Sequence, residues 1–358
     1  MTNVNWKDEL SQAVTEVPEL FRLLELPIDW ESSSVSRDNS LKYSLNNSLE
    51  YSLFVPRSFV GKMTKGDSND PLLLQILPRL EEQALVSGFS RDPLHELSNH
   101  VSKHLSNHFL CDSSCRVLKK YAGRALLLVS NSCGIHCRFC FRRFFPRPNR
   151  SDKSCFNDND FETLLEPIRS DNTIEEVILS GGDPLLLDDW ELERLLYYIV
   201  KISHVKRIRI HSRLPIVLPN RLTPELIKIL SFPFPIYLVL HVNHPNELSD
   251  DFWVRRENLN VPVILSQTVL LKGINDNFDV LYQLFDQLID HRIIPYYLHQ
   301  LDRVHGAAHF EVSPDKGCRL LEQLRNCLPG YAIPRYVREI PGMLSKQEIG
   351  NHEEGSLL

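Results

Sequence analysis

The feature that most constrains the fold is a regular alternation of apolar runs and amphipathic segments between about residue 120 and residue 330. Runs with the length and composition of buried strands lie at 124–130, 176–180, 207–212, 236–242, 262–270 and 295–301. Segments with helical spacing follow them, near 160–169, 189–202, 223–231, 249–259, 277–291 and 314–327. Repeated strand–helix units predict parallel strands joined by right-handed crossovers, and strands that are apolar throughout fit burial on both faces.

A partial barrel, a complete barrel and a doubly wound sheet all satisfy this α/β pattern. In each of them the functional side chains gather at the carboxyl ends of the strands. We divide the chain into a helical N-terminal extension over 1–115, a core over 116–330 and a short C-terminal segment over 331–358. Apolar residues at helical spacing predict one amphipathic helix over 5–26 in the extension.

Charge and hydropathy exclude several classes of protein. The chain has 358 residues and a formal net charge of −6, so no basic character points to nucleic acid or acidic lipid. Its longest apolar runs are strand-sized, well short of the ~20 residues that span a membrane. The start, "MTNVNWKDEL", lacks the apolar core of a secretory signal. We expect a cytoplasmic protein that binds neither nucleic acid nor membrane.

Three cysteines follow the first predicted strand within the stretch "SNSCGIHCRFCF". Cys133, Cys137 and Cys140 have the spacing C-x3-C-x2-C. A closed zinc site and a fully protein-ligated cubane cluster both need four ligands. Three thiolates on one loop therefore predict a metal centre with one open coordination position, where chemistry can take place.

The alternative is a zinc site that a fourth residue closes. His136, Cys115 and Cys155 are the candidates for that ligand. The protein would then be a zinc or iron–sulfur protein with a structural or electron-transfer role.

The second predicted strand ends in "SGGDPL", which contains Ser180, Gly181, Gly182 and Asp183. Glycines after a buried strand let a ligand approach the backbone closely. The carboxylate of Asp183 could accept a hydrogen bond from an ammonium group. The alternative is an ordinary turn that caps the next helix.

An aromatic residue, Phe139, precedes the third cysteine, and C-x3-C-x-φ-C resembles the signature of the radical S-adenosylmethionine superfamily. The resemblance implies a partial (β/α)6 TIM-like barrel. It also implies a [4Fe–4S] cluster on the three cysteines, with S-adenosylmethionine bound at the fourth iron. "SGGD" resembles the segment of that family that binds the methionine amino group.

Longer motifs resemble the lysine 2,3-aminomutase family over about residues 55–346: "KYAGRALLLVSNSCGIHCRFCFRRFFP", "RIRIHSRLPIVLPNRLT", "HVNHPNEL", "SQTVLLKGIND" and "YYLHQLDRVHGAAHF". They look closest to the branch that makes (R)-β-lysine for modification of elongation factor P. The resemblance implies an isomerase acting on L-lysine with pyridoxal 5′-phosphate. It further implies a homo-oligomer, an electron donor such as flavodoxin or ferredoxin, and a downstream lysyl-transfer enzyme that serves elongation factor P.

The same resemblance implies the residues that hold pyridoxal phosphate. Lys346, in "PGMLSK", is the catalytic lysine that forms the Schiff base, although 343–345 replace the glycines usual in the family. Arg124 and Lys120 would contact the phosphate. A lysine at 120 keeps the charge of the usual arginine but lacks its two-pronged geometry.

The resemblance also implies the substrate contacts. Arg142 would bind the α-carboxylate of lysine, and Asp302 with Glu339 would bind its side-chain ammonium. Glu339 is one methylene longer than the aspartate usual in the free-lysine enzymes. His241 and Gln267, at strand ends, would face the cofactors.

Two further expectations complete the sequence analysis. A related aminomutase could instead act on glutamate, arginine or a protein-bound lysine, but an acidic pair argues against glutamate. The chain ends in "NHEEGSLL", without the C-terminal cysteine cluster that binds zinc in clostridial-type enzymes, so we expect no structural zinc.

Overall fold

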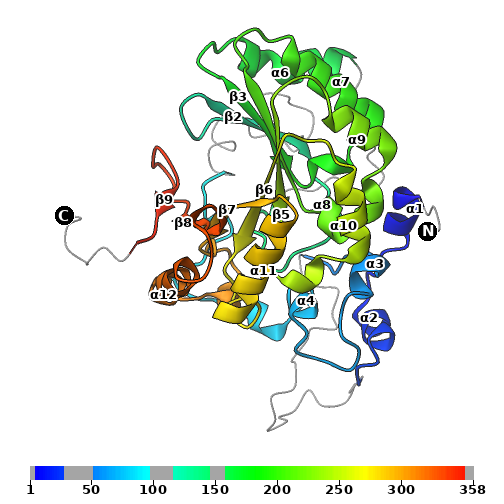
Figure 1. Ribbon diagram of the computed structural model, residues 1–358, viewed down its shortest axis with the longest axis vertical. Helices are drawn as coiled ribbons and strands as arrows, with labels where there is room; N and C mark the ends of the chain where they lie inside the picture. The colour runs from blue at the N-terminus through cyan, green and yellow to red at the C-terminus, as the bar shows by residue number, and fades with distance from the viewer. Residues whose placement is uncertain (1–4, 28–50, 97–115, 146–157, 351–358) are drawn as a thin grey trace.

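The computed structural model describes residues 5–27, 51–96, 116–145 and 158–350, and its centre is one sheet with strands in sequential order (Figure 1). Strands β2 to β8 are parallel, and β1 and β9 pair antiparallel at the two edges. The strands are β1 Val117–Leu118, β2 Arg124–Ser130, β3 Glu176–Gly181, β4 Arg207–Ser212, β5 Ile236–His241, β6 Val263–Val269, β7 Ile294–His299, β8 Arg335–Arg338 and β9 Gln347–Glu348.

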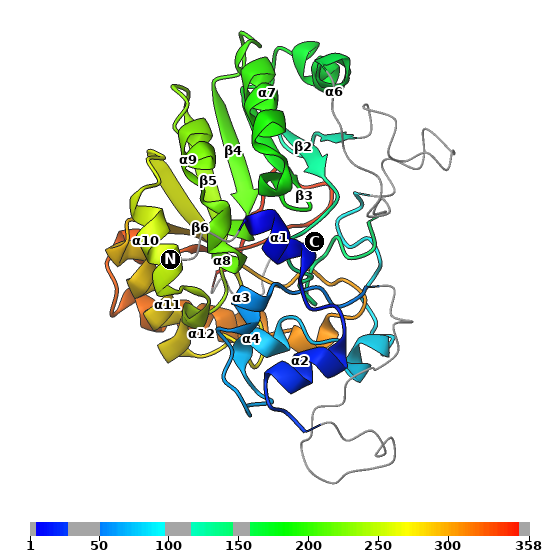
Figure 2. The ribbon, with the colours of Figure 1, turned by 90° about the vertical axis from the view of Figure 1, so that its right-hand side faces the viewer.

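The strand order separates the architectures that the sequence left open. A doubly wound sheet reverses its strand order near the middle, whereas here each parallel strand pairs with the next one along the chain. The larger helices lie along the outside of the curved sheet (Figures 1 and 2). They are α6 Asp158–Arg169, α7 Asp189–Val200, α9 Pro224–Leu230, α10 Asp250–Glu257, α11 Phe278–Asp290 and α12 Pro314–Arg325. This is the partial barrel, and each predicted strand and helix of the core is confirmed to within about three residues.

Strand β8 was not predicted. It adds a further parallel strand beyond β7, and it belongs to the segment after residue 330. Its sequence, "RYVR", buries only Tyr336 and Val337 between two exposed arginines. Four residues with charged ends give too little apolar pattern to indicate a strand from the sequence.

The predicted helix over 5–26 is wrong, because two short helices replace it: α1 Trp6–Ser11 and α2 Val17–Leu23. Between them Val14 forms an antiparallel bridge with Val55. Pro18 fits the first turn of α2, where its missing N–H costs nothing. Helices α3 Arg57–Val60 and α4 Pro71–Leu74 follow in the described part of the extension.

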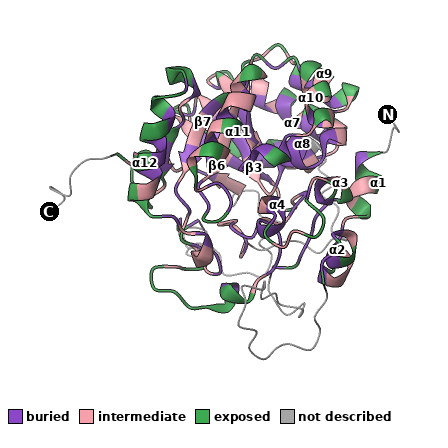
Figure 3. Cartoon of the chain, turned by 60° about the horizontal axis from the view of Figure 1, so that its bottom comes forward, coloured by how far each residue is buried: buried purple, intermediate pink, exposed green. Residues whose placement is uncertain are grey.

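The extension lies beneath the carboxyl ends of the strands, as Figure 2 shows for α2, α3 and α4. The main core fills the space between the sheet and the outer helices, and buried residues occur in both the barrel and the extension (Figure 3). A second core belongs to the extension but also includes Ile135 of the cysteine loop. Phe139 of the same loop packs edge-on against Phe310, with ring centroids 6.2 Å apart, in a third cluster that also includes Leu74 of α4. The cysteine loop is therefore held by the second and third clusters.

None of the helices in the described ranges combines the length and apolar character needed to cross a bilayer.

Candidate functional site

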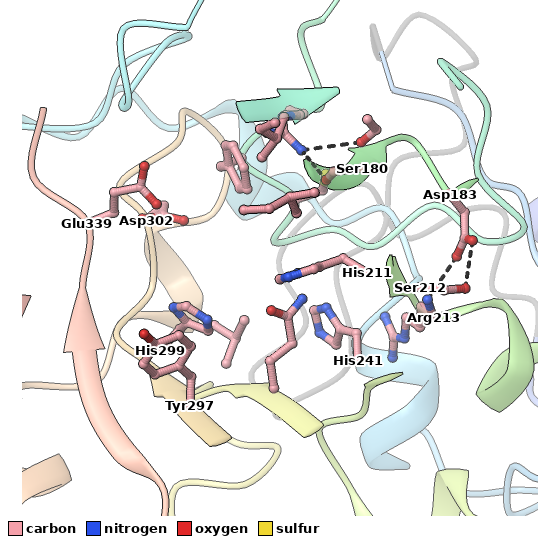
Figure 4. A pocket seen from close by; sticks show the side chains of 18 of the residues that line it. Ser180, Asp183, His211, Ser212, Arg213, His241, Tyr297, His299, Asp302 and Glu339 are labelled. Atoms are coloured by element: carbon pink, nitrogen blue, oxygen red, sulfur yellow. Dashed lines mark hydrogen bonds between the residues drawn. The ribbon is translucent and has the colours of Figure 1, made fainter. Parts of the chain in front are cut away.

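A cavity of about 440 Å³ lies at the carboxyl ends of the parallel strands, in the place where the strand pattern predicted function (Figure 4). Every site residue predicted from the sequence lines this cavity. They are Lys120, Arg124, Cys133, Cys137, Cys140, Arg142, Ser180, Gly181, Gly182, Asp183, His241, Gln267, Asp302, Glu339 and Lys346. The fold thus gathers residues from both ends of the chain into one site, whereas the role of each residue stays a prediction.

Of the three candidate fourth ligands of a zinc site, His136 lies within the described residues, and its contacts lead away from the cysteines. The ring of His136 stacks on Tyr51, with centroids 4.9 Å apart, and its Nδ1 lies 2.8 Å from the carbonyl oxygen of Ser52. His136 therefore faces the N-terminal extension. Cys115 and Cys155 lie outside the described residues.

A buried ion cluster anchors the cysteine loop. Glu82 accepts hydrogen bonds from Arg138, whose Nε lies 2.7 Å from Oε1, and from Arg143. Arg138 is fully buried and also donates to the carbonyl oxygen of Tyr51 at 2.7 Å. Burial alone would raise the pKa of Glu82, but the two guanidinium groups hold it below its ordinary value. No periodic pattern in the sequence indicated this cluster.

Gly181, the last residue of β3, and Gly182, which follows it, make room for the cysteine loop rather than for a ligand alone. A Cβ on Gly182 would lie 2.0 Å from the carbonyl oxygen of Ser132, and one on Gly181 would lie 2.3 Å from that of Ser130. Gly181 also has φ +114°, which favours glycine. The amides of Gly182 and Asp183 donate to the carbonyl oxygens of Ser130 and Ser132 at 2.5 Å and 2.8 Å. These contacts fix the cysteine loop against the end of β3.

Asp183 caps the loops around it. Its Oδ1 accepts from the amide of Leu185 at 3.0 Å and from the hydroxyl of Ser212 at 2.7 Å. Its Oδ2 accepts from the amides of Arg213 and Leu214 at 2.8 Å and 2.9 Å. The structure therefore shows the capping role that the sequence left as an alternative, and contact with an ammonium group stays a prediction.

Arg213, at the end of β4, reaches one of the cysteines. Its Nη1 donates to Sγ of Cys137 at 2.7 Å, and its Nη2 donates to Gln75 and Glu247 at 2.6 Å and 2.9 Å. Burial raises the pKa of the Cys137 thiol, and the guanidinium opposes that rise. Arg213 was not predicted for the site, although its place directly after a strand, in "RIHSRLP", was a usable signal.

Five residues form an alternating series of charges along the cavity wall, which we call the charge chain: Arg142, Glu96, Lys120, Glu339 and Lys346. Glu96 pairs with two nitrogens of Arg142, Nε at 2.7 Å and Nη2 at 3.0 Å, and with Nζ of Lys120 at 2.5 Å. Glu339 accepts from Lys120 and from Lys346, each at 2.6 Å. Four of these residues were predicted for the site, and Glu96 was missed.

Two carboxylates with contrasting pKa values face the same side of the cavity (Figure 4). Burial opposes ionisation of Glu339, but Lys346 and Lys120 lower its pKa to about 2. Burial raises the pKa of Asp302 to about 7, although Lys346 opposes the rise. At neutral pH Glu339 is therefore charged, and Asp302 is divided between its two forms.

Arg124 is the cation of the cavity wall that lacks an acidic partner in the described part of the chain. Its guanidinium lies 5.6 Å from the ring centroid of Tyr121. An arginine without a carboxylate partner can bind an anion at lower cost than one that must first break an ion pair.

Three histidines stand in the middle of the cavity (Figure 4): His211, His241 and His299. Burial lowers the pKa of each imidazole, that of His241 to about 3, so all three are neutral at pH 7. His241 Nε2 lies 3.2 Å from Oδ1 of Asn243, and His241 pairs in the sheet with Gln267. Neutral imidazoles supply one donor and one acceptor each. His211 and His299 were not predicted for the site.

The chain is similar to several known proteins. Residues 122–212 match the family model described as a 4Fe-4S single cluster domain. The chain is 40% identical to the L-lysine 2,3-aminomutase of Escherichia coli strain K12 over 348 residues, 96% of this chain and 94% of that one. It is 31% identical to the L-lysine 2,3-aminomutase of Clostridium subterminale, covering 94% of this chain and 76% of that one. Among solved structures, Streptococcus suis SuiB bound to S-adenosylmethionine aligns with a TM-score of 0.47 at 17% identity, over 68% of this chain and 54% of that one.

Proposed function

Because the chain belongs to the L-lysine 2,3-aminomutase family, we propose that it is an isomerase that moves the α-amino group of L-lysine to the β-carbon and forms (R)-β-lysine. The observation that carries the proposal is the single cavity shared by three cysteines, Lys346 and an acidic pair. A structural zinc protein or an electron-transfer protein does not need Lys346 or the acidic pair of Asp302 and Glu339 beside its metal.

The cysteine loop fits an iron–sulfur cluster. Cys133, Cys137 and Cys140 line one cavity from one loop. Arg213 donates a hydrogen bond to the sulfur of Cys137, and hydrogen bonds to the sulfurs are a common feature of iron–sulfur clusters. We assign the three thiolates to a [4Fe–4S] cluster, and the wall formed by 180–183, His241 and Gln267 to S-adenosylmethionine. When bound, this pair supplies the one-electron chemistry that starts a radical rearrangement. The chain's contribution is a half-buried loop, fixed on both sides, that limits the access of water to a reactive radical.

The opposite wall fits pyridoxal phosphate, a group that stabilises the migrating nitrogen and an unpaired electron when bound. Lys346 places its amine in the cavity, where Glu339 accepts from it at 2.6 Å. Arg124, which has no acidic partner among the described residues, offers its guanidinium for the phosphate. Lys120 offers a second charge, but Glu96 and Glu339 already pair with it.

The substrate contacts follow from the charges that remain. Glu96 accepts from the Nε–Nη2 edge of Arg142, and Nη1 donates to Ser180 and Gly181. An α-carboxylate bound at the Nη1–Nη2 edge would take the place of these weaker Nη1 contacts. Asp302 and Glu339 offer negative charge to a side-chain ammonium. This arrangement favours lysine over glutamate, because glutamate would place a third carboxylate beside the two that are present.

Further proposals rest on the motif resemblance. The product would serve a lysyl-transfer enzyme that modifies elongation factor P, and flavodoxin or ferredoxin would supply the electron. A cytoplasmic homo-oligomer without structural zinc and the division at residues 115 and 330 also stay predictions.

A substrate panel under argon tests the proposal. Protein reconstituted with iron, sulfide and pyridoxal phosphate is incubated with S-adenosylmethionine, dithionite and L-lysine, L-arginine, L-glutamate or a lysine-containing peptide. Chiral chromatography identifies the products. We expect (R)-β-lysine from free L-lysine and no product from glutamate. A β-amino acid from another member of the panel, with none from lysine, would replace the proposed substrate.

A further inference from the structure

We propose that Glu96 is a positioning residue for the substrate: it orients Arg142 toward the α-carboxylate and ties that arginine to the residues that bind the ammonium. The inference rests on the proposed function and deepens it. Glu96 is the one member of the charge chain to which neither the motifs nor the family resemblance gave a role.

The geometry at Arg142 is that of a fixed guanidinium. Glu96 makes two parallel contacts to it, at 2.7 Å and 3.0 Å, the arrangement that best defines the plane of an arginine. Nη1 donates to the hydroxyl of Ser180 at 3.1 Å and more weakly to the carbonyl of Gly181 at 3.4 Å. The plane of the guanidinium is thus set by Glu96 on one side and by the end of β3 on the other.

Oε1 of Glu96 contacts both Arg142 Nη2 and Lys120 Nζ, and this shared oxygen couples the arginine to the far end of the substrate. Lys120 Nζ lies 2.5 Å from Glu96 and 2.6 Å from Glu339. With Glu96 ionised, Lys120 divides its charge between two carboxylates. Without that charge, Lys120 would pair with Glu339 alone and would compete with the substrate ammonium for it. Glu96 therefore influences both ends of a bound lysine, the α-carboxylate through Arg142 and the side-chain ammonium through Lys120.

Its surroundings set Glu96 apart from a carboxylate that only stabilises the fold. Its side chain is 1% exposed, and Arg142 and Lys120 together hold its pKa below the ordinary value against the effect of burial. Both partners line the cavity. Glu82 is a matched control, because it is also 1% exposed and also pairs with two cations. Its partners Arg138 and Arg143, however, are not among the residues that line the cavity.

The test compares Glu96→Gln and Glu96→Asp with Glu82→Gln in reconstituted enzyme. We expect Glu96→Gln to keep the iron, sulfide and pyridoxal phosphate content of the wild type and to raise the KM for L-lysine roughly tenfold to a hundredfold, with a smaller effect on kcat. Glu96→Asp should restore part of the affinity. Glu82→Gln should lose iron and sulfide instead. In an Arg142→Lys background, Glu96→Gln should change KM much less, because the group that it orients is gone.

Three outcomes would overturn the inference. One is a Glu96→Gln enzyme with unchanged KM, and another is additivity with Arg142→Lys. The third is loss of iron and sulfide from both Glu96 variants to the extent seen in Glu82→Gln, which would make Glu96 a structural residue. A wild-type enzyme that converts lysine alongside any of these results leaves the proposed function intact. A wild type that makes no β-lysine removes the premise and overturns both proposals.

Discussion

Replacing Gly182 by alanine tests how the cysteine loop is held. The added Cβ would lie 2.0 Å, 2.6 Å and 2.8 Å from the carbonyl oxygen, carbonyl carbon and amide nitrogen of Ser132. Ordinary contact begins at 3.4 Å, so the backbone must separate by 3.4 − 2.0 = 1.4 Å. All three atoms are backbone, and no side-chain rotation can relieve the overlap.

The magnitude follows from what this separation breaks. Overpacking in a well-packed region costs about 1–3 kcal/mol. The two hydrogen bonds that join the amides of Gly182 and Asp183 to the cysteine loop contribute about 1 kcal/mol each. Gly182→Ala should therefore lower the free energy of unfolding by about 3–5 kcal/mol. The thermal midpoint should fall by roughly 5–10 °C.

Gly330→Ala is the matched control. Nothing lies within 4 Å of a Cβ at Gly330, and its φ is not positive. Its stability should change by no more than about 0.5 kcal/mol. Thermal unfolding under argon, with iron and sulfide analysis after reconstitution, compares the two variants. Equal midpoints and equal iron content would refute the view that the glycine pair fixes the cysteine loop.

Three other variants test individual residues. Lys346→Ala should lose the pyridoxal phosphate absorbance and all β-lysine formation while keeping its iron, and a borohydride-reducible cofactor adduct in this variant would place the Schiff base elsewhere. Asp302 is protonated below its pKa of about 7, and only the ionised form pairs with an ammonium, so kcat/KM for lysine should fall as the pH drops through 7. In Asp302→Asn this fall of kcat/KM at acidic pH should disappear. If the fall remains in the variant, a group other than Asp302 causes it. Arg213→Met removes the donor to Cys137 and should lower the reduction potential of the reconstituted cluster, because hydrogen bonds to sulfur favour the reduced state. An unchanged potential, measured by anaerobic titration, would count against that contact.

The repeating pattern of the core was readable because parallel strands carry long apolar runs. Strands such as Arg124–Ser130 and Arg207–Ser212 were predicted to the residue. Strand β8 escaped because its four residues include two exposed arginines. The helix predicted over 5–26 was wrong because the spacing of apolar residues cannot indicate a bridge from Val14 to Val55, 41 positions away.

The residues of the site were also predictable only in part. Residues within recognisable motifs, such as Cys137, Glu339 and Lys346, do line one cavity. Glu96 sits in a loop without periodicity, and its importance lies entirely in its partners, Arg142 and Lys120. Partners that are 24 and 46 positions away cannot be read from local sequence, because only the fold brings them together.

The most direct test of the account combines metal and product analysis of one anaerobically prepared sample. The account predicts iron and acid-labile sulfide in equal amounts, bound pyridoxal phosphate, and (R)-β-lysine from L-lysine once S-adenosylmethionine and dithionite are added. Zinc in place of iron and sulfide, with no β-lysine formed, would contradict it and would favour a structural metal site on the cysteine loop.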